Sequence, residues 1–194
     1  GGIFYIWDVE KGKAVREISF KRDIPWSIEF SPDGKYFAVG TYGKVLLYDA
    51  KTWNQIMVLN GGLPVKFSSD GSLLVYSVSM SRDNLQIYGI RMTELTTGKS
   101  HTMLPAMKIE RVDWADFDKY DKRIITVGRK IFYWDNNTGK LISSILLKDP
   151  SGKTAAPDAI SDDKKYAAEK YVVNDKVKGL RLWNIPEGKI IHHF

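Results

Sequence analysis

Two short segments, Gly98-Lys99-Ser100 and Gly152-Lys153-Thr154, contain the residue types that end a phosphate-binding loop. In such a loop the backbone N–H groups surround the phosphates and the lysine adds a positive charge. The complete motif needs another glycine five residues before the Gly-Lys pair, but Thr93 and Leu147 occupy those positions. Neither segment leads into a helical pattern, so no helix N-terminus would face a phosphate. Both segments are predicted to be turns, and no cofactor is expected.

The histidines do not form the pattern that a metal site or a general base requires. His192 and His193 are adjacent, so in a strand their side chains point to opposite faces. His101 starts a predicted inner strand, where we expect it to be packed or to face a central channel. The chain has no cysteine, which excludes disulfides and thiolate metal sites.

A group of acids, Asp113, Asp116, Asp118 and Asp121, surrounds one predicted turn. Carboxylates are calcium ligands, but this spacing lacks the glycine and the distal glutamate of a calcium loop. We interpret these residues as solvated turn acids. Because no Ser-His-Asp arrangement is recognisable either, the sequence predicts no catalytic residue, no metal and no enzyme activity.

A repeated turn motif, which we call the corner, indicates the elements that position these residues. Phe30-Ser-Pro-Asp33-Gly34 has the residues of a type I turn, and it stands between two apolar runs of strand length. The corner returns as 67–71, loosely as 114–118, and as 160–164. A second motif alternates with the corner. Its aromatic anchors are Trp7, Tyr48, Tyr88, Trp134 and Trp183.

Both motifs recur roughly every 37 to 49 residues, and each period holds four short strands, which is typical of one propeller blade. Trp7-Asp8 and Trp134-Asp135 end two of the predicted strands, and Tyr48-Asp49 and Trp183-Asn184 are common variants of that ending. On these endings and the corner, the whole chain resembles the WD40 family. It is a divergent member, because the Gly-His pair of that family is missing from every blade.

The resemblance implies an all-β fold, a β-propeller of four-stranded antiparallel blades forming an incomplete ring over residues 1–194. We expect four full blades near 13–50, 54–91, 100–136 and 140–185. The strands 3–9 and 190–194 are then orphans at the two ends of the chain. Since such propellers usually close with more blades, we expect the missing blades on the rest of a longer chain or on another chain.

Composition narrows the choice of partner. The net charge is +6, with a sequence pI near 9.3, but the lysines are spread along the chain, which indicates solubility more than a polyanion site. No apolar run reaches the roughly 18 residues that a membrane helix needs, so no membrane association is expected. The absence of cysteine leaves the compartment open, with the cytoplasm favoured.

Trp53 is the aromatic residue that departs from the repeat. It lies in the turn 51–54, where other blades carry Glu, Gly or Thr. An exposed tryptophan in a turn is typical of a binding hot spot. The alternative is that Trp53 folds back over its own blade. Trp7, Trp26, Trp134 and Trp183 are instead predicted to be packing residues.

We therefore predict a non-catalytic protein-interaction scaffold. The turn containing Trp53 and the corners would share one rim, and the candidate partner-binding residues there are Trp53, Lys35, Asp33, Asp70, Lys13 and Lys140. A mixed-charge surface suits a protein better than a polyanion. The alternatives are an RNA- or ribonucleoprotein-associated propeller, which the basic charge favours, and an enzyme or ligand sensor with a site at the channel mouth.

Overall fold

The computed structural model describes residues 2–20, 23–82, 85–103, 112–128, 130–152, 157–173 and 176–194. Within these ranges the chain forms strands and turns and no helix. The strands form a two-stranded sheet and four four-stranded sheets, all antiparallel and with neighbouring strands consecutive along the chain. The prediction of an all-β fold with four-stranded antiparallel blades is confirmed.

The two-stranded sheet comes first and contains β1 (Gly2–Asp8) and β2 (Lys13–Phe20). The first blade contains β3 (Pro25–Phe30), β4 (Tyr36–Thr41), β5 (Lys44–Asp49) and β6 (Gln55–Asn60). The second contains β7 (Gly62–Phe67), β8 (Leu73–Arg82), β9 (Leu85–Glu94) and β10 (Ser100–Met103). The third contains β11 (Trp114–Phe117), β12 (Arg123–Val127), β13 (Ile131–Asp135) and β14 (Leu141–Ile145). The fourth contains β15 (Ala159–Ile160), β16 (Tyr166–Val173), β17 (Lys176–Asn184) and β18 (Lys189–His193).

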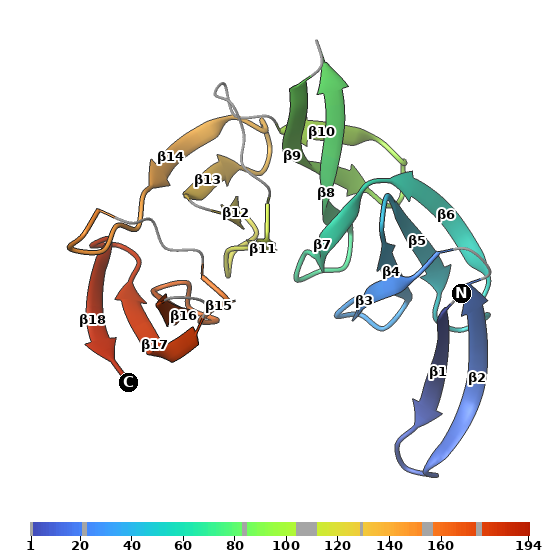
Figure 1. Ribbon diagram of the computed structural model, residues 1–194. Coiled ribbons are helices and arrows are strands. Elements are labelled where there is room, and N and C mark those ends of the chain that lie inside the picture. The colour runs from blue at the N-terminus through green and yellow to red at the C-terminus, as the bar shows by residue number, and fades with distance from the viewer. Residues whose placement is uncertain are drawn as a thin grey trace.

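The sheets follow one another around an open arc, with a gap between the β1–β2 sheet and the fourth blade (Figure 1). The first strands of successive blades contact one another, β3 with β7 and β7 with β11, and therefore line the inside of the arc. The apolar core lies between sheets. One cluster joins Ala38 and Leu47 of the first blade to Val65 of the second, and another joins Met92 of the second to Ile124 of the third.

The blade boundaries differ from the predicted ones by one strand. The strand that follows each aromatic anchor was expected to open the next blade, but it closes the current one: β2 pairs with β1, and β6 pairs with β5. The physical reason is the short connection, because a turn of a few residues between antiparallel strands forms a hairpin within one sheet. The N-terminal strand therefore has a partner, and the C-terminal strand β18 completes the fourth blade.

The third corner also lies elsewhere than predicted. Its apolar anchor is Phe117, not Trp114, because β11 runs to Phe117 and the turn occupies 118–122. Asp118 takes the place that serine has in the other corners: its carboxylate accepts the N–H groups of Lys122 and Arg123 at 2.9 and 3.2 Å. The sequence analysis placed this corner three residues too early because aspartate replaces serine as the acceptor.

The predicted packing role holds for two of the four tryptophans. Trp134 and Trp183 are 3% and 0% exposed, and the indole N–H of Trp134 donates to Thr126 Oγ1 at 3.0 Å. Trp7 and Trp26 are 59% and 64% exposed, so the prediction was wrong for them. Each lies on a sheet face that no other described residues cover.

In the described part of the chain, none of the elements is a helix long and apolar enough to cross a membrane.

Candidate interaction rim

Each blade has a corner between its first two strands and a second turn, which we call the outer turn, between its last two strands. In every blade the two turns meet at one end of the molecule. In each blade an amide of the outer turn donates to a carbonyl of the corner. The pairs are Ala50 to Lys35 at 2.8 Å, Leu95 to Ser72 at 2.9 Å, Asn136 to Lys122 at 3.0 Å and Ile185 to Lys165 at 2.8 Å. The resemblance to WD40 repeats implies that both kinds of turn share an edge, and these contacts agree with it. We call this edge, made of residues 31–35, 50–54, 68–72, 95–99, 118–122, 136–140, 161–165 and 185–188, the corner rim.

Serine and aspartate side chains close the corners. In the first blade, Ser31 Oγ donates to Asp33 Oδ1 at 2.7 Å and accepts the N–H of Tyr36 at 2.9 Å. Ser68 and Ser161 make the same contacts with Asp70 and Asp163. Each corner also holds a residue with positive φ, which is glycine in the first two blades. These side-chain bonds replace the strand pairing that the turn interrupts.

The same bonds lower the pKa of the corner carboxyls. For Asp33, hydrogen bonds from Lys35, Ser31 and the Lys35 backbone lower the pKa from 3.8 to about 2. Hydrogen bonds from Ser68 and Ser72 lower the pKa of Asp70, and those from Ser161 and Lys165 lower the pKa of Asp163. Burial raises the pKa of Asp118, but the hydrogen bonds from Arg123 and Lys122 outweigh it, so the net direction is also down. The corner rim therefore carries fixed negative charges at neutral pH.

Neighbouring corners touch one another across the blade boundaries. The Asp33 carboxylate lies against Gly71, where an added Cβ would come within 3.0 Å of Oδ1. Between the second and third blades, the N–H of Ser69 donates to Asp121 Oδ2 at 2.8 Å. Between the third and fourth, Lys164 pairs with Asp116 at 2.5 Å. The rim is thus a continuous surface of contacting turns, and its geometry is set by the cores beneath it.

The outer turns share a second design. Each places a residue with positive φ just before its last strand, and in four of the five hairpins that residue is glycine, namely Gly12, Gly98, Gly139 and Gly188. The fifth is Trp53, with φ of 62°. An L-residue in this region is disfavoured by contact between its Cβ and the backbone, and a bulky one is an outlier.

Trp53 is partly buried against its own blade. Its ring lies 5.8 Å from that of Phe37, whose ring stacks on Tyr48 at 4.8 Å. It belongs to the residues that pack against the cluster shared by the first blade and the β1–β2 sheet. This is the geometry of the alternative considered above, in which the indole folds back, although the side chain is not fully covered.

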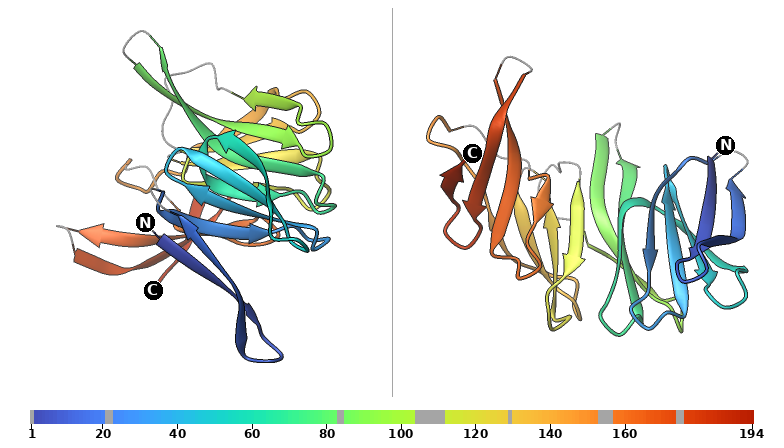
Figure 2. Two further views of the ribbon diagram at one scale, coloured as in Figure 1. Left: turned by 90° about the vertical axis from the view of Figure 1, so that its right-hand side faces the viewer. Right: turned by 90° about the horizontal axis from the view of Figure 1, so that it is seen from below.

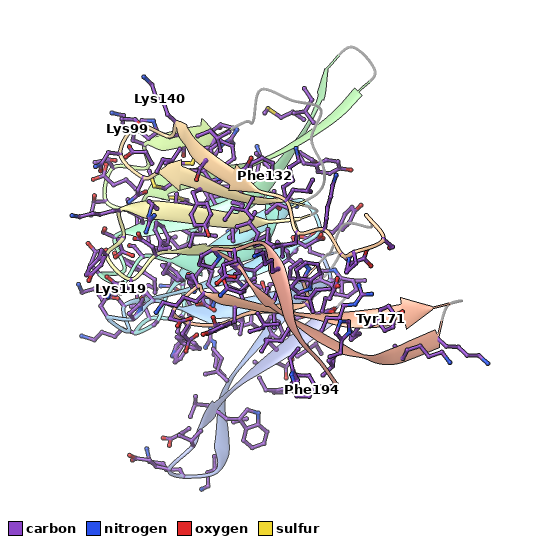
Figure 3. The ribbon with its side chains drawn as sticks, turned by 90° about the vertical axis from the view of Figure 1, so that its left-hand side faces the viewer. Lys99, Lys119, Phe132, Lys140, Tyr171 and Phe194 are labelled. Carbon is purple, nitrogen blue, oxygen red and sulfur yellow. The ribbon has the colours of Figure 1, made fainter. Side chains whose placement is uncertain are left out.

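The other candidate residues fall into two groups. Lys35 forms an exposed ion pair with Asp33 at 2.9 Å, and the corner of Asp33 contacts that of Asp70 through Gly71. Trp53 lies in the outer turn of the same blade as Lys35 and Asp33, but its ring packs on Phe37 on the side of the β1–β2 sheet, whereas Asp70 belongs to the second blade. Lys140 lies on the outer turn of the third blade, whereas Lys13 lies in the hairpin of the β1–β2 sheet and outside the corner rim. Lys99, Lys119 and Lys140 are seen along one end of the molecule in Figure 3.

Sequence reasoning missed the residues that join the corners. Ser69 was not singled out, Asp121 was interpreted only as a solvated turn acid, and the pairing of Lys164 with Asp116 was not predicted. The positive φ of Asp121 and Lys164 places them where the other corners have glycine. Aligning the corners on the acceptor side chain, Ser31, Ser68, Asp118 and Ser161, would have found them.

The structure places some of the residues whose catalytic or binding chemistry the sequence analysis rejected. Gly98 to Ser100 forms an outer turn and the start of β10, as predicted. Lys153 lies outside the described residues. His101 is exposed on β10, the outermost strand of the second blade, so the expectation that it starts an inner strand and is packed or faces a channel was wrong. Among the described residues, no group of three or more His, Asp or Glu side chains could hold a metal ion.

Comparison with known proteins supports the fold. No family model and no curated protein matches the sequence. Among solved structures, TolB from Acinetobacter baumannii is similar, with a TM-score of 0.64 and 20% identity over 92% of this chain and 45% of that chain. The C-terminal domain of TolB is a β-propeller. Together with the four-stranded sheets (Figure 2), this likeness defines a β-propeller fold. The chain spans less than half the length of that TolB chain.

Proposed function

We propose that the chain is a segment of a WD40-like propeller that acts as a protein-interaction scaffold, and that its partner docks on the corner rim around Trp53. The observation that carries this proposal is the backbone of Trp53, which adopts a φ of 62° where the four equivalent turns have glycine. Strained residues of this kind cluster at binding and catalytic sites. Because glycine satisfies the fold at this position, the tryptophan calls for another explanation, and binding supplies one.

The charges of the corner rim support a protein partner over a nucleic acid. Lys35 is paired with Asp33 in the first blade, and Lys164 of the fourth blade is paired with Asp116 of the third. Both ion pairs reduce the positive potential offered to phosphates. Corner carboxylates with lowered pKa add fixed negative charge. A surface of alternating charges around a partly exposed aromatic residue is the usual anatomy of a protein interface.

A peptide-display selection tests this proposal. Peptides that bind the immobilised chain are selected and then titrated against the Trp53→Gly variant, which removes the indole but keeps the backbone conformation. We expect binding to weaken by about 2 kcal/mol, as for a hot-spot residue. The matched control is Tyr42→Gly, in the opposite turn between β4 and β5, where the side chain is 94% exposed. If the affinity of the peptides falls in Tyr42→Gly and is unchanged in Trp53→Gly, the binding surface lies at the opposite end of the molecule.

We further propose that additional strands, from the rest of a longer chain or from another chain, continue the propeller beside β1. Ile28 and Phe30 pair with Val39 and Phe37, so they lie on the face of the first blade that the β1–β2 sheet covers farther out. Yet Trp26, Ile28 and Phe30 are 64%, 37% and 48% exposed. Two strands added to the free edge of β1 would cover this apolar stripe.

A further inference from the structure

The second and third strands of each blade present one face toward the next blade of the chain, and we call it the forward face. In the first blade this face contains Ala38, Val45 and Leu47, all 0% exposed. They pack against Val65 and Phe67 of the second blade in one apolar cluster. Two more clusters are built in the same way, between the second and third blades and between the third and fourth. The forward face is therefore the surface on which the following blade packs.

The forward face of the fourth blade carries almost the same residues as that of the first. Three cross-strand pairs locate this face in the first blade, namely Tyr36–Asp49, Ala38–Leu47 and Gly40–Val45. The equivalent pairs in the fourth blade are Tyr166–Asn184, Ala168–Leu182 and Lys170–Leu180. Tyrosine, alanine and leucine recur at the same places, and leucine replaces valine at another. The fourth blade ends the arc (Figure 1), and there Tyr166 and Leu180 are 40% and 48% exposed.

Phe194 extends this row on the outermost strand. Its N–H donates to the Leu180 carbonyl at 2.9 Å and its carbonyl accepts the Leu180 N–H at 3.1 Å. In the first blade Leu59 pairs with Val45 at the same place and packs on the cluster shared with the second blade. Phe194 is instead 71% exposed. Tyr166, Leu180 and Phe194 thus form one half of an apolar contact whose other half, in the first blade, is a neighbouring blade.

We propose that a complete propeller blade, carried by a continuation of the same chain after residue 194, packs on the forward face of the fourth blade. The connection is short, because β7 begins at Gly62, three residues after Leu59. The proposal rests on the packing between blades and not on the role of Trp53. It extends the proposed continuation of the propeller to the other end of the arc.

A second copy of the chain fits this face less well. A following blade meets the forward face through its first two strands, as Val65 of β7 and Leu74 of β8 do. The sheet that a second copy leaves free is the β1–β2 sheet. Its strands correspond to the last two of a blade, because Trp7 has the same register shift as the anchors there. It therefore lacks the strands that make this contact.

Lys170 indicates how the following blade differs from the second one. Lys170 takes the place of Gly40, where an added Cβ would lie 2.7 Å from Leu63 Cδ2 and 3.0 Å from Val65 Cγ2. The lysine side chain would meet these atoms if the following blade had the same residues. We expect that blade to carry smaller side chains at the places of Leu63 and Val65.

A grafted blade tests the proposal. Residues 60–103 are repeated directly after Phe194, so a copy of the second blade follows the fourth at the spacing that the chain itself uses. Every chain compared carries Lys170→Gly, which reproduces Gly40, and Leu180→Cys, which introduces the single thiol because the chain has no cysteine. We expect a maleimide to label this thiol about tenfold or more slowly with the graft, because a buried thiol reacts only when its interface opens.

Two controls separate packing from other effects of the graft. With the thiol moved to Ile142→Cys on β14, where the side chain is 52% exposed, the graft should leave the labelling rate unchanged. Serines at the graft positions that copy Val65 and Phe67 should restore fast labelling of Leu180→Cys. All rates are measured at a dilution at which the ungrafted chain sediments as a monomer. Unchanged labelling with the graft, equal slowing with the serine graft, or equal protection in the ungrafted chain would each overturn the proposal.

Discussion

Trp53 and the glycines at equivalent positions show how the backbone angle φ limits which side chain an outer turn can accommodate. Gly12 has φ of 59° and Trp53 has φ of 62°, so the two turns have the same shape with different side chains. The tryptophan recovers part of the backbone cost by packing on Phe37. The corner carboxylates also act through single residues, because each one accepts the hydrogen bonds that close a turn and places a negative charge on the rim.

Substitutions at residue 53 should separate backbone strain from packing. Trp53→Ala loses the indole and keeps a Cβ at positive φ, whereas Trp53→Gly loses both. We expect the glycine variant to be more stable than the alanine variant by about 1 kcal/mol, measured by urea unfolding. Gly12→Ala measures the backbone cost alone, because an added Cβ there meets nothing within 4 Å. Equal stabilities of the two Trp53 variants would show that the turn is not strained.

Acid should destabilise the fold through its corners. The pKa of Asp33 falls from 3.8 to about 2 on folding, so its contribution is present above pH 4 and is lost as pH falls toward 2. Asp70 and Asp163 shift in the same direction. Unfolding free energies between pH 2 and pH 6 should therefore decline at the acid end, and less steeply in Asp33→Asn. Identical pH profiles for the variant and the unmodified chain would contradict this role.

At the scale of strands and turns, the repeated outer hairpin organises each blade. The pairing register shifts by one residue next to Trp7, Tyr48, Trp134 and Trp183, so the same irregularity accompanies the aromatic anchor in these hairpins. A bulge of this kind increases the local twist and directs the side chain. The anchor is buried where a neighbouring sheet covers it, as for Trp134, and exposed where none does, as for Trp7.

This contrast provides a matched pair of substitutions. Trp134→Ala should lower the free energy of unfolding by about 3–5 kcal/mol, as expected for truncating a buried aromatic residue. Trp7→Ala, at the equivalent position of the β1–β2 sheet but 59% exposed, should cost much less. Chemical denaturation measures both values. A small loss for Trp134→Ala would mean that the third blade does not pack as described.

The repeat explains why so much of the fold was predictable. Strand number and antiparallel pairing follow from turn chemistry at Asp33-Gly34 and from the aromatic anchors, and the shared rim is what the resemblance to WD40 repeats implies. The boundary of each blade did not follow, because the residues between Asp8 and Lys13 fit either a hairpin or a crossing to the next blade. The site was harder still. The contacts that join neighbouring corners, such as the N–H of Ser69 with Asp121, depend on packing between blades, which no sequence spacing indicates.

At the scale of the whole molecule, the described residues leave three apolar faces uncovered. One contains Ile3, Tyr5 and Trp7 of β1, the second contains Trp26, Ile28 and Phe30, and the third, on the fourth blade, contains Tyr166, Leu180 and Phe194. Successive blades elsewhere bury such faces against each other, as Leu47 and Val65 do. Contiguous exposed apolar surface marks an interaction site or a tendency to aggregate.

The isolated chain should therefore self-associate through these faces. Sedimentation velocity over a range of concentrations should show oligomers, and Trp26→Ser with Phe30→Ser should shift them toward the monomer. Tyr120→Ser is the control, because Tyr120 is 66% exposed but belongs to a corner. Oligomers that persist in the double variant would assign the association to another surface.

Hydrogen–deuterium exchange of the chain with and without a selected peptide is the most direct test of the proposed working surface. If the corner rim binds protein through Trp53, the peptide will slow amide exchange at 31–35 and 50–54, the corner and the outer turn of the first blade. The opposite turn at 41–44 will exchange at its original rate. Protection at 41–44 with none at 31–35 and 50–54 would contradict the account.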